Sequence, residues 1–120
     1  MPEERAETSC IFCRIAAREI PSDIVRESDL LVAFRDTNPQ ASTHILIISK
    51  EHVASIADVE ERHGDLLVDI AKAATQLARA EGIAESGWRL VTNVGPEAGQ
   101  SVFHLHVHLL GGRPMGWPPG

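Results

Sequence analysis

The sequence lacks an excess of positive charge, long apolar segments and internal repeats. Its 120 residues include 11 Lys and Arg against 17 Asp and Glu, which gives a formal net charge of −6. Non-specific binding to nucleic acid or to an anionic membrane depends on cationic side chains, so we expect neither partner. A phosphate-bearing substrate would then have to be held by a local arrangement of donors.

Cysteine is scarce, and no stretch of the chain resembles a targeting segment. The first residues, Met-Pro-Glu-Glu-Arg-Ala-Glu, lack the apolar core of a secretory signal, and no segment approaches the roughly 18 apolar residues of a membrane span. We therefore expect a cytoplasmic protein. Its two cysteines, Cys10 and Cys13, would be reduced there, so a structural disulfide is not expected. A chain of this length with 43% hydrophobic residues supports one domain.

Histidines, in contrast, are concentrated in one segment. Residues 104–110 read His-Leu-His-Val-His-Leu-Leu and hold three of the six histidines. As a strand, this segment places the three imidazoles on one face, about 6.6–7 Å apart, close enough to line one pocket. The alternative is a solvent-facing strand. Gly95 and Gly99 before the segment and Gly111 at its end favour a ligand site, because glycine lets a backbone approach a ligand closely.

The periodicity of apolar residues predicts an α+β fold. We expect a short helix that starts near Cys10 and ends before Pro21, a long helix over 60–81, and strands at 24–27, 30–35, 44–48, 88–94 and 104–110. Hairpin-length links between the early strands favour a five-stranded, mostly antiparallel sheet over a doubly wound parallel one. The folded domain is placed at 9–113, between a flexible N-terminus (1–8) and an extended tail (114–120).

Imidazole chemistry suits the histidine segment to nucleophilic catalysis. Neutral imidazole attacks phosphorus or carbonyl carbon near neutral pH, and the central His106 is the expected nucleophile. The flanking histidines can fix its tautomer or donate to developing charge. Ser101 and backbone N–H groups near Gly99 can complete an anion cradle, so no magnesium should be needed. Asp36 follows a predicted strand and can bind the vicinal hydroxyls of a ribose; the alternative is a turn residue.

The residues of this segment resemble a known family. The sequence from Gln100 to Arg113 is similar to the signature of the histidine-triad (HIT) superfamily, and the ending Gly-Trp-Pro-Pro-Gly resembles its Hint branch of nucleoside phosphoramidases. Other segments that match this branch are 11–12, 19–21, 33–36 and 39–44. The resemblance implies a dimeric, HIT-like α+β fold that hydrolyses purine nucleoside 5′-phosphoramidates, such as adenosine 5′-monophosphoramidate, through a nucleotidyl-histidine.

The resemblance also implies roles by position. His106 corresponds to the nucleophile and Asp36 to the residue that binds the ribose hydroxyls. The groups that hold the phosphate correspond to Ser101, His108, Asn93 and the backbone near Gly99 and Gln100. The wall around the base corresponds to Phe12, Ile20, Phe34 and Leu46, with Thr37 at its edge, where apolar residues are common in the branch. Phe12 and Leu46 are equally interpretable as core residues.

The cysteine pair distinguishes this chain from the best-known animal members of the branch. Some bacterial HIT proteins resemble the chain here and bind zinc through such a pair, a histidine after the third strand and the first triad histidine. In this sequence these residues are Cys10, Cys13, His52 and His104. Helical spacing puts both thiols on one side, and two cysteines with two histidines form a closed, structural zinc site. The alternative is that the cysteines are small apolar groups on a packed helix.

Three functions fit these residues. The first is a phosphoramidate hydrolase, the second a nucleotide-binding interaction module with slow turnover, and the third a dinucleoside polyphosphate hydrolase of the related Fhit branch. An intact His106 with Ser101 and His108 favours an enzyme, and the Trp-Pro-Pro-Gly ending favours phosphoramidates. We also expect a homodimer, because the long helix has spare apolar positions and Trp117 can reach toward the partner's active site.

Overall fold

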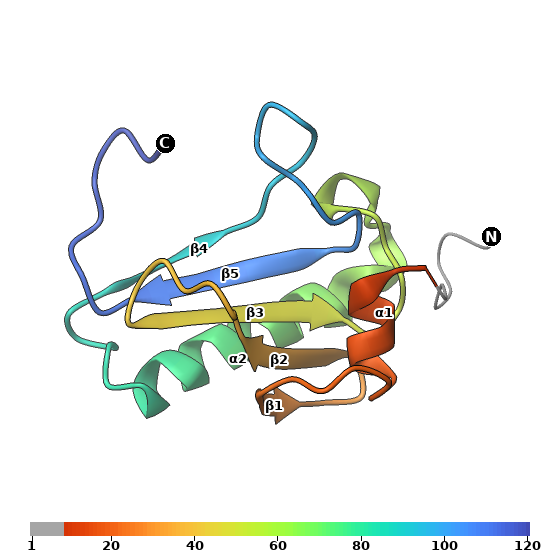
Figure 1. The fold of residues 1–120 in the computed structure, drawn as a ribbon, viewed down its shortest axis with the longest axis horizontal. Helices are drawn as coiled ribbons and strands as arrows, with labels where there is room; N and C mark the ends of the chain where they lie inside the picture. Colours follow the sequence, from red (N-terminus) through yellow and green to blue (C-terminus); the bar gives the residue numbers. More distant parts are fainter. Residues whose placement is uncertain (1–8) are drawn as a thin grey trace.

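Five strands form a single antiparallel sheet in the order β1-β2-β3-β5-β4 (Figure 1). The computed structural model describes residues 9–120, so the predicted flexible N-terminus at 1–8 lies outside the described residues. The strands are β1 Ile24–Glu27, β2 Leu31–Arg35, β3 Thr43–Ser49, β4 Trp88–Val91 and β5 His106–Gly111. The helices are α1 Ile11–Ala16 and α2 Gly64–Ala80, with 3-10 turns at Ile56–Asp58 and Glu61–His63. The predicted α+β class with one long and one short helix is confirmed.

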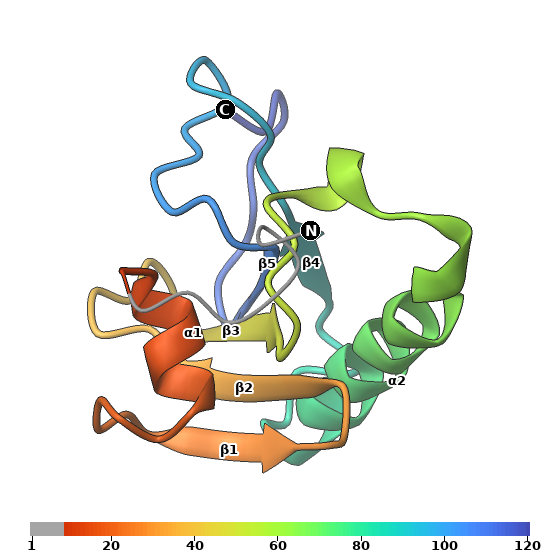
Figure 2. The ribbon, with the colours of Figure 1, turned by 90° about the vertical axis from the view of Figure 1, so that its right-hand side faces the viewer.

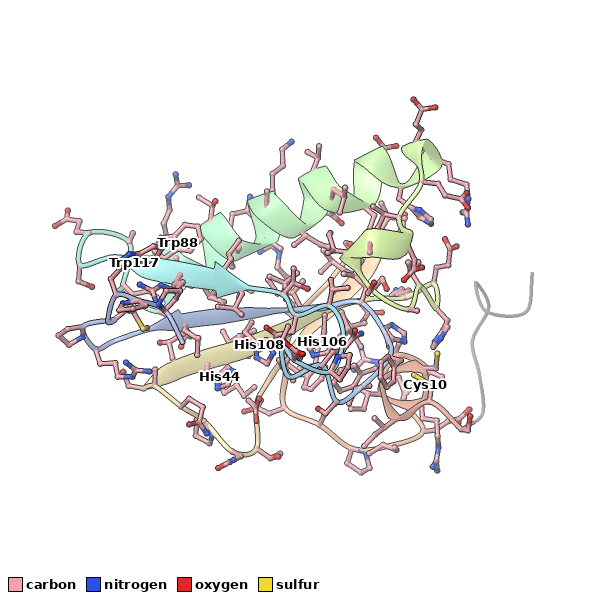
Figure 3. The ribbon with its side chains drawn as sticks, turned by 90° about the horizontal axis from the view of Figure 1, so that it is seen from above. Cys10, His44, Trp88, His106, His108 and Trp117 are labelled. Carbon is pink, nitrogen blue, oxygen red and sulfur yellow. The ribbon has the colours of Figure 1, made fainter. Side chains whose placement is uncertain are left out.

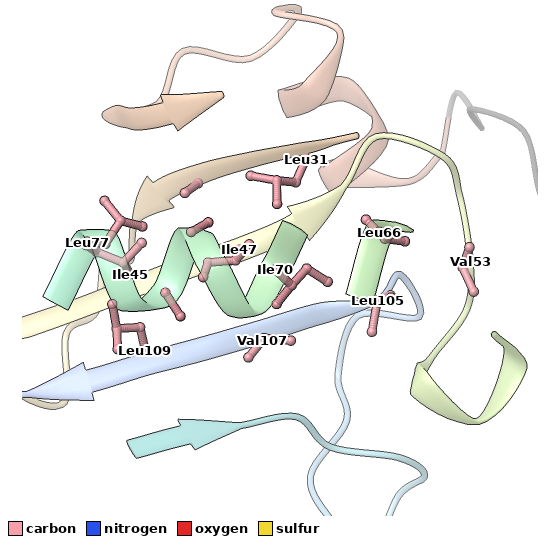
Figure 4. Close-up of a cluster of buried hydrophobic side chains, with 13 residues drawn as sticks. Leu31, Ile45, Ile47, Val53, Leu66, Ile70, Leu77, Leu105, Val107 and Leu109 are labelled. Atoms are coloured by element: carbon pink, nitrogen blue, oxygen red, sulfur yellow. The ribbon is translucent and has the colours of Figure 1, made fainter. Parts of the chain in front are cut away.

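The two helices cover opposite faces of the sheet (Figure 2). Side chains alternate along each strand, so β3 and β5 present one set of residues to each helix. Toward α2 they present Ile45, Ile47 and Leu109, which are fully buried. These side chains pack with Ile70 and Leu77 of α2 in the main hydrophobic core (Figure 4). Each fully buried aliphatic side chain contributes about 1.5–3 kcal/mol, and this face holds the larger of the two hydrophobic clusters.

The histidines lie on the other face of the sheet. His108 of β5 is in register with Leu46 of β3, and His106 lies two positions before it on the same side. Phe12 of α1 packs there against Phe34 of β2 in a smaller cluster. Because α1 has only 6 residues, it covers one end of this face (Figure 1). The middle of the face is left for the histidines.

Two strand boundaries differ from the predicted ones. The histidine strand begins at His106 instead of residue 104, because His104 lies in a bend and turns its side chain toward the cysteines. Strand β4 ends at Val91 instead of residue 94. Directly after this strand end, the Thr92 hydroxyl donates to the His106 carbonyl at 2.8 Å.

The long helix starts later than predicted, at Gly64 instead of residue 60. The chain before it forms a 3-10 turn, closed by the Glu60 N–H, which donates to His63 Nδ1 at 2.8 Å. At the other end, Gly82 has φ +77°, the left-handed conformation expected after a helix. Within residues 9–120, neither this helix nor the shorter one combines the length and apolar character required to cross a bilayer.

Candidate active site and metal centre

The histidines of β5 line a cavity of about 360 Å³ on the α1 side of the sheet. The structure brings nine predicted site residues to its wall: Phe12, Ile20, Phe34, Asp36, Thr37, Leu46, Ser101, His106 and His108. They come from α1, three strands and the connecting loops, so segments distant in the sequence converge here. Asn93, Gly99 and Gln100 are not among the lining residues.

His106 is held in one tautomer. Its Nδ1 lies 2.7 Å from the carbonyl oxygen of His104, and because a carbonyl only accepts, Nδ1 carries the proton. Nε2 then keeps its lone pair, which is the nucleophilic form of imidazole. The residue is only 7% exposed, and its ring meets the Phe12 ring edge-on at 5.0 Å between centroids. These contacts fix the ring before any substrate binds.

A second hydrogen-bond chain orients His108. The Gln40 N–H donates to His44 Nδ1 at 3.0 Å, so the His44 proton is on Nε2. That nitrogen lies 2.9 Å from Nδ1 of His108, whose side chain lies near His44 in Figure 3. It also lies 3.4 Å from Asp36 Oδ2. Because His108 Nδ1 accepts this proton, its own N–H is on Nε2. The cavity is thus lined by two complementary imidazoles, a lone-pair donor on His106 and a hydrogen-bond donor on His108.

Burial keeps His44 and His108 neutral. Desolvation and the neighbouring imidazoles of His106 and His44 lower the pKa of His108 to about 4. Desolvation also lowers the pKa of His44, and the Asp36 carboxylate offsets part of that shift. At neutral pH neither ring is charged, so the proton positions derived above describe the working state of the site.

Gln100 shapes the loop that carries Ser101. The Gln100 side chain is buried, donates to the Ala54 carbonyl at 2.8 Å and accepts the Gly95 N–H at 3.0 Å. Gly99 adopts φ +88°, a conformation that favours glycine. The two residues therefore bend the chain and bring Ser101 to the cavity, while the expected role of their backbone in holding a phosphate stays a prediction.

Asp36 is a turn residue that also lines the cavity. Its Oδ1 accepts the Asn38 N–H at 2.8 Å, the hydrogen bond of an Asx turn. The same carboxylate lines the cavity, with Oδ2 toward His44. The turn therefore fixes a carboxylate beside the cavity.

Cys10, Cys13, His52 and His104 converge in a cluster, as expected, with all four ligand atoms within 4.8 Å of one another. Cys13 Sγ lies 3.2 Å from His52 Nδ1 and 3.4 Å from His104 Nδ1, and Cys10 Sγ lies 3.3 Å from His104 Nδ1. A tetrahedral zinc ion with bonds of about 2.0–2.3 Å requires ligand atoms about 3.3–3.8 Å apart. The residues therefore fit the ion.

The environment of His104 also suits a metal ligand. Its Nε2 donates to the Ser49 carbonyl at 2.7 Å, so Nδ1 presents its lone pair to the sulfur atoms. Desolvation lowers the pKa of this fully buried residue to about 4. The ring is therefore neutral, which is the form that binds metal.

Several known proteins are similar to this chain in sequence and in fold. The profile of the HIT domain matches residues 17–115. The purine nucleoside phosphoramidase of Escherichia coli K12 is 51% identical over 106 residues, 88% of this chain and 89% of that protein. The 14 kDa zinc-binding protein of Zea mays is 50% identical over 116 residues, 95% of this chain and 90% of that protein.

The similarity extends to three dimensions. A crystal structure of a HIT family hydrolase from Legionella pneumophila Philadelphia 1 has a TM-score of 0.91 and 54% identity, and the match covers 93% of this chain and 100% of that one. The fold and the triad thus define a histidine-triad protein. The chain belongs to the HIT domain family.

Sequence reasoning missed the part that His44 plays in the site. It is the second residue of β3, a strand that is buried throughout, and is itself only 6% exposed. A histidine directly before the aliphatic residues of a buried strand was the available signal. Its ring bonds to the Gln40 N–H of the preceding loop and to His108 on the neighbouring strand β5, and the sequence contains no direct sign of that pairing.

Proposed function

We propose that this protein hydrolyses purine nucleoside 5′-phosphoramidates through a nucleotidyl intermediate on His106. The observation that carries the proposal is the His106 Nδ1–H bond to the His104 carbonyl at 2.7 Å, which leaves the Nε2 lone pair in the cavity. The phosphoramidase name of the Escherichia coli relative agrees with this chemistry.

The cavity has matching parts for a nucleotide. Asp36 can accept hydrogen bonds from both ribose hydroxyls, as a carboxylate oxygen pair does. The apolar wall of Phe12, Phe34 and Leu46 suits the face of a purine, since stacking on aromatic and apolar groups needs no charge. The α-phosphate then lies between Ser101 and the two β5 histidines.

Hydrolysis proceeds in two displacements. His106 Nε2 attacks the α-phosphorus, the P–N bond breaks, and the amine leaves with a proton from His108 Nε2 or the Ser101 hydroxyl. Water then attacks the phosphoryl-imidazole and returns a proton to the group that gave one to the amine, which releases the nucleoside monophosphate and frees His106. The imidazole and hydroxyl donors stabilise the developing charge, so magnesium is not required.

In this proposal the metal centre has a structural role and takes no part in the reaction. Cys10, Cys13, His52 and His104 would hold zinc, which links α1 to the chain just before β5 when it is bound. The zinc-binding name of the Zea mays relative supports this assignment. We also propose that the protein is a cytoplasmic homodimer whose C-terminal tail reaches the partner subunit.

Kinetics on a small substrate panel test the function. The wild type should convert adenosine 5′-phosphoramidates faster than diadenosine polyphosphates, and rapid quenching should trap an adenylate on the protein. His106→Ala should lose about 10²–10⁴-fold in kcat, while AMP still binds because Asp36 and the apolar wall are intact. A wild type without the covalent adenylate, or a variant with near-normal turnover, would contradict the proposal. A preference for diadenosine polyphosphates would assign the chain to the other hydrolase class.

A further inference from the structure

His104 connects the cysteine cluster to the proposed nucleophile. Its Nδ1 lies 3.3 Å from Cys10 Sγ and 3.4 Å from Cys13 Sγ. Its carbonyl oxygen accepts the Nδ1–H of His106 at 2.7 Å. Because His104 is fully buried, its ring cannot change position without moving its neighbours and its own backbone. The carbonyl that selects the His106 tautomer therefore depends on the chemical state of the two sulfur atoms.

Helix α1 provides a second connection from the cysteines to His106. Cys10 is the N-cap of the helix, and its Sγ accepts the Cys13 N–H at 3.4 Å. Phe12 lies between the two cysteines in sequence, and its ring contacts His106 and His104 with centroids 5.0 and 6.0 Å away. A change at the start of α1 thus reaches His106 through both the residue 104 backbone and the Phe12 ring.

Of the two cysteines, Cys10 lies closer to solvent. Cys10 is half-buried and, with His52 and Phe103, lines a surface groove of about 430 Å³. Cys13 is buried behind it, and the two Sγ atoms are no more than 4.8 Å apart. This spacing permits a disulfide after a modest side-chain rotation. Cys10 is therefore positioned as the attacked thiol and Cys13 as the resolving thiol.

We propose that Cys10 and Cys13 form a redox switch that positions His106 through His104, an inference that rests on the proposed hydrolase function. A hydroperoxide, ROOH, oxidises the Cys10 thiol: the S–O bond forms, the O–O bond breaks, and ROH leaves. The Cys13 thiol attacks the resulting sulfenic acid, the S–S bond forms, and water leaves. Two thiols are oxidised to one disulfide and one hydroperoxide is reduced.

Oxidation removes the partners of the His104 ring. A disulfide offers no thiolate ligands, so the four residues would no longer hold zinc, and His104 Nδ1 would no longer face two thiol sulfur atoms. The opposite ring nitrogen is already bonded to the Ser49 carbonyl at 2.7 Å, so a change of tautomer would break that bond. Residue 104 then shifts, and its carbonyl no longer holds His106. Misplacing a reacting group by ~1 Å can lower the rate about 10²-fold.

Comparison of the reduced and peroxide-treated protein tests the switch. Thiol titration and intact mass follow the disulfide, and a chromogenic chelator follows zinc release. We expect kcat for adenosine 5′-phosphoramidate to fall at least about 10-fold in step with the thiols. AMP affinity should change much less, and dithiothreitol with added zinc should restore the rate. Nitrogen-15 NMR should show a single Nδ1-protonated His106 in the reduced protein and a tautomer mixture in the oxidised one.

The matched control is Cys10→Ser, which cannot form the disulfide. Its basal rate can be lower, but hydrogen peroxide should not reduce that rate further. Equal peroxide sensitivity in Cys10→Ser and wild type would overturn the proposal, as would a disulfide that changes neither kcat nor the His106 tautomer. Reduced wild type that hydrolyses no phosphoramidate contradicts the proposed function instead, and the NMR measurement still tests the coupling between the cysteines and His106.

Discussion

At the scale of single residues, protonation of His108 opposes folding. Its pKa is about 4 in the folded protein because of burial and the neighbouring imidazoles, below the ~6.5 of an exposed histidine. Between these values the unfolded chain binds more protons, so stability is fully present above pH ~6.5 and is lost as the pH falls toward about 4. His44, whose pKa is also lowered by burial, acts in the same direction.

We therefore predict that replacing His108 makes the free energy of unfolding less dependent on pH below about pH 6.5. His108→Asn should remove about 1–3 kcal/mol of the change in unfolding free energy between neutral pH and pH ~4.5. Urea denaturation of the variant and the wild type across this range measures the difference. Parallel curves for the two proteins would show that His108 titrates alike in the folded and unfolded chain.

His44 is predicted to act on the rate through His108. His44→Ala removes the donor that faces His108 Nδ1 at 2.9 Å, so the His108 ring can adopt either tautomer. We expect kcat for a phosphoramidate to fall about 10–100-fold, with a smaller change in KM. His63→Ala is the control, since His63 is equally buried but bonds to Glu60 and Glu51. Equal losses of kcat in both variants would indicate general destabilisation.

At the scale of the elements, α2 stabilises the sheet through one face only. Ile70 is 5% exposed and belongs to the main core, whereas Val68 on the same helix is 56% exposed. We predict that Ile70→Ala lowers the free energy of unfolding by about 2–5 kcal/mol, because it leaves a cavity against the sheet. Val68→Ala should change it by less than about 0.5 kcal/mol. If chemical denaturation finds similar losses of unfolding free energy for both variants, Ile70 does not face the sheet as described.

The elements themselves could be predicted from sequence where one pattern dominates. The aliphatic residues of β3 and the apolar stripe of α2 determine both elements, since burial of those side chains fixes face and period. The predicted boundaries of two strands were wrong at positions where individual side chains form specific hydrogen bonds. The end of β4 coincides with the bond from the Thr92 hydroxyl to the His106 carbonyl, and β5 begins only after the bend at His104. Such bonds depend on which groups meet across the sheet, and the local sequence does not contain that information.

The same limit applies to the candidate site. The histidine triad could be predicted from its residue types and spacing, whereas the positions of Asp36 and of the four-residue cysteine cluster followed from the resemblance to the HIT family. The hydrogen-bond chain from Gln40 to His108 could not be predicted, because its partners come from a loop and two strands. The Gln100 side chain is a second example, because its bonds to the Ala54 carbonyl and the Gly95 N–H stabilise the loop and could not be predicted from the local sequence.

At the scale of the whole molecule, one edge of the sheet is suited to a second copy of the chain. Strand β4 ends the strand order and, among residues 9–120, has no partner on its outer side. Arg89 of β4 donates to the Gly116 carbonyl at 3.1 Å, which ties the tail to this edge. Trp117 next to it is 83% exposed and lies far from Cys10 (Figure 3). An unpaired edge beside a large exposed aromatic is typical of an interaction surface.

We predict a homodimer through this edge, with the tail selecting the leaving amine at the partner's cavity. Deletion of residues 114–120 should shift the ratio of kcat/KM values between bulky and small amines by about 10-fold, while the melting temperature changes little because Trp117 buries almost nothing in its own subunit. Light scattering at micromolar concentration measures the dimer, and kinetics over a set of adenosine phosphoramidates measure selectivity. Leu30→Ala, at the β1–β2 turn near the opposite edge, should alter neither result. A monomeric wild type, or a truncated protein with the original selectivity, would exclude this role of the tail.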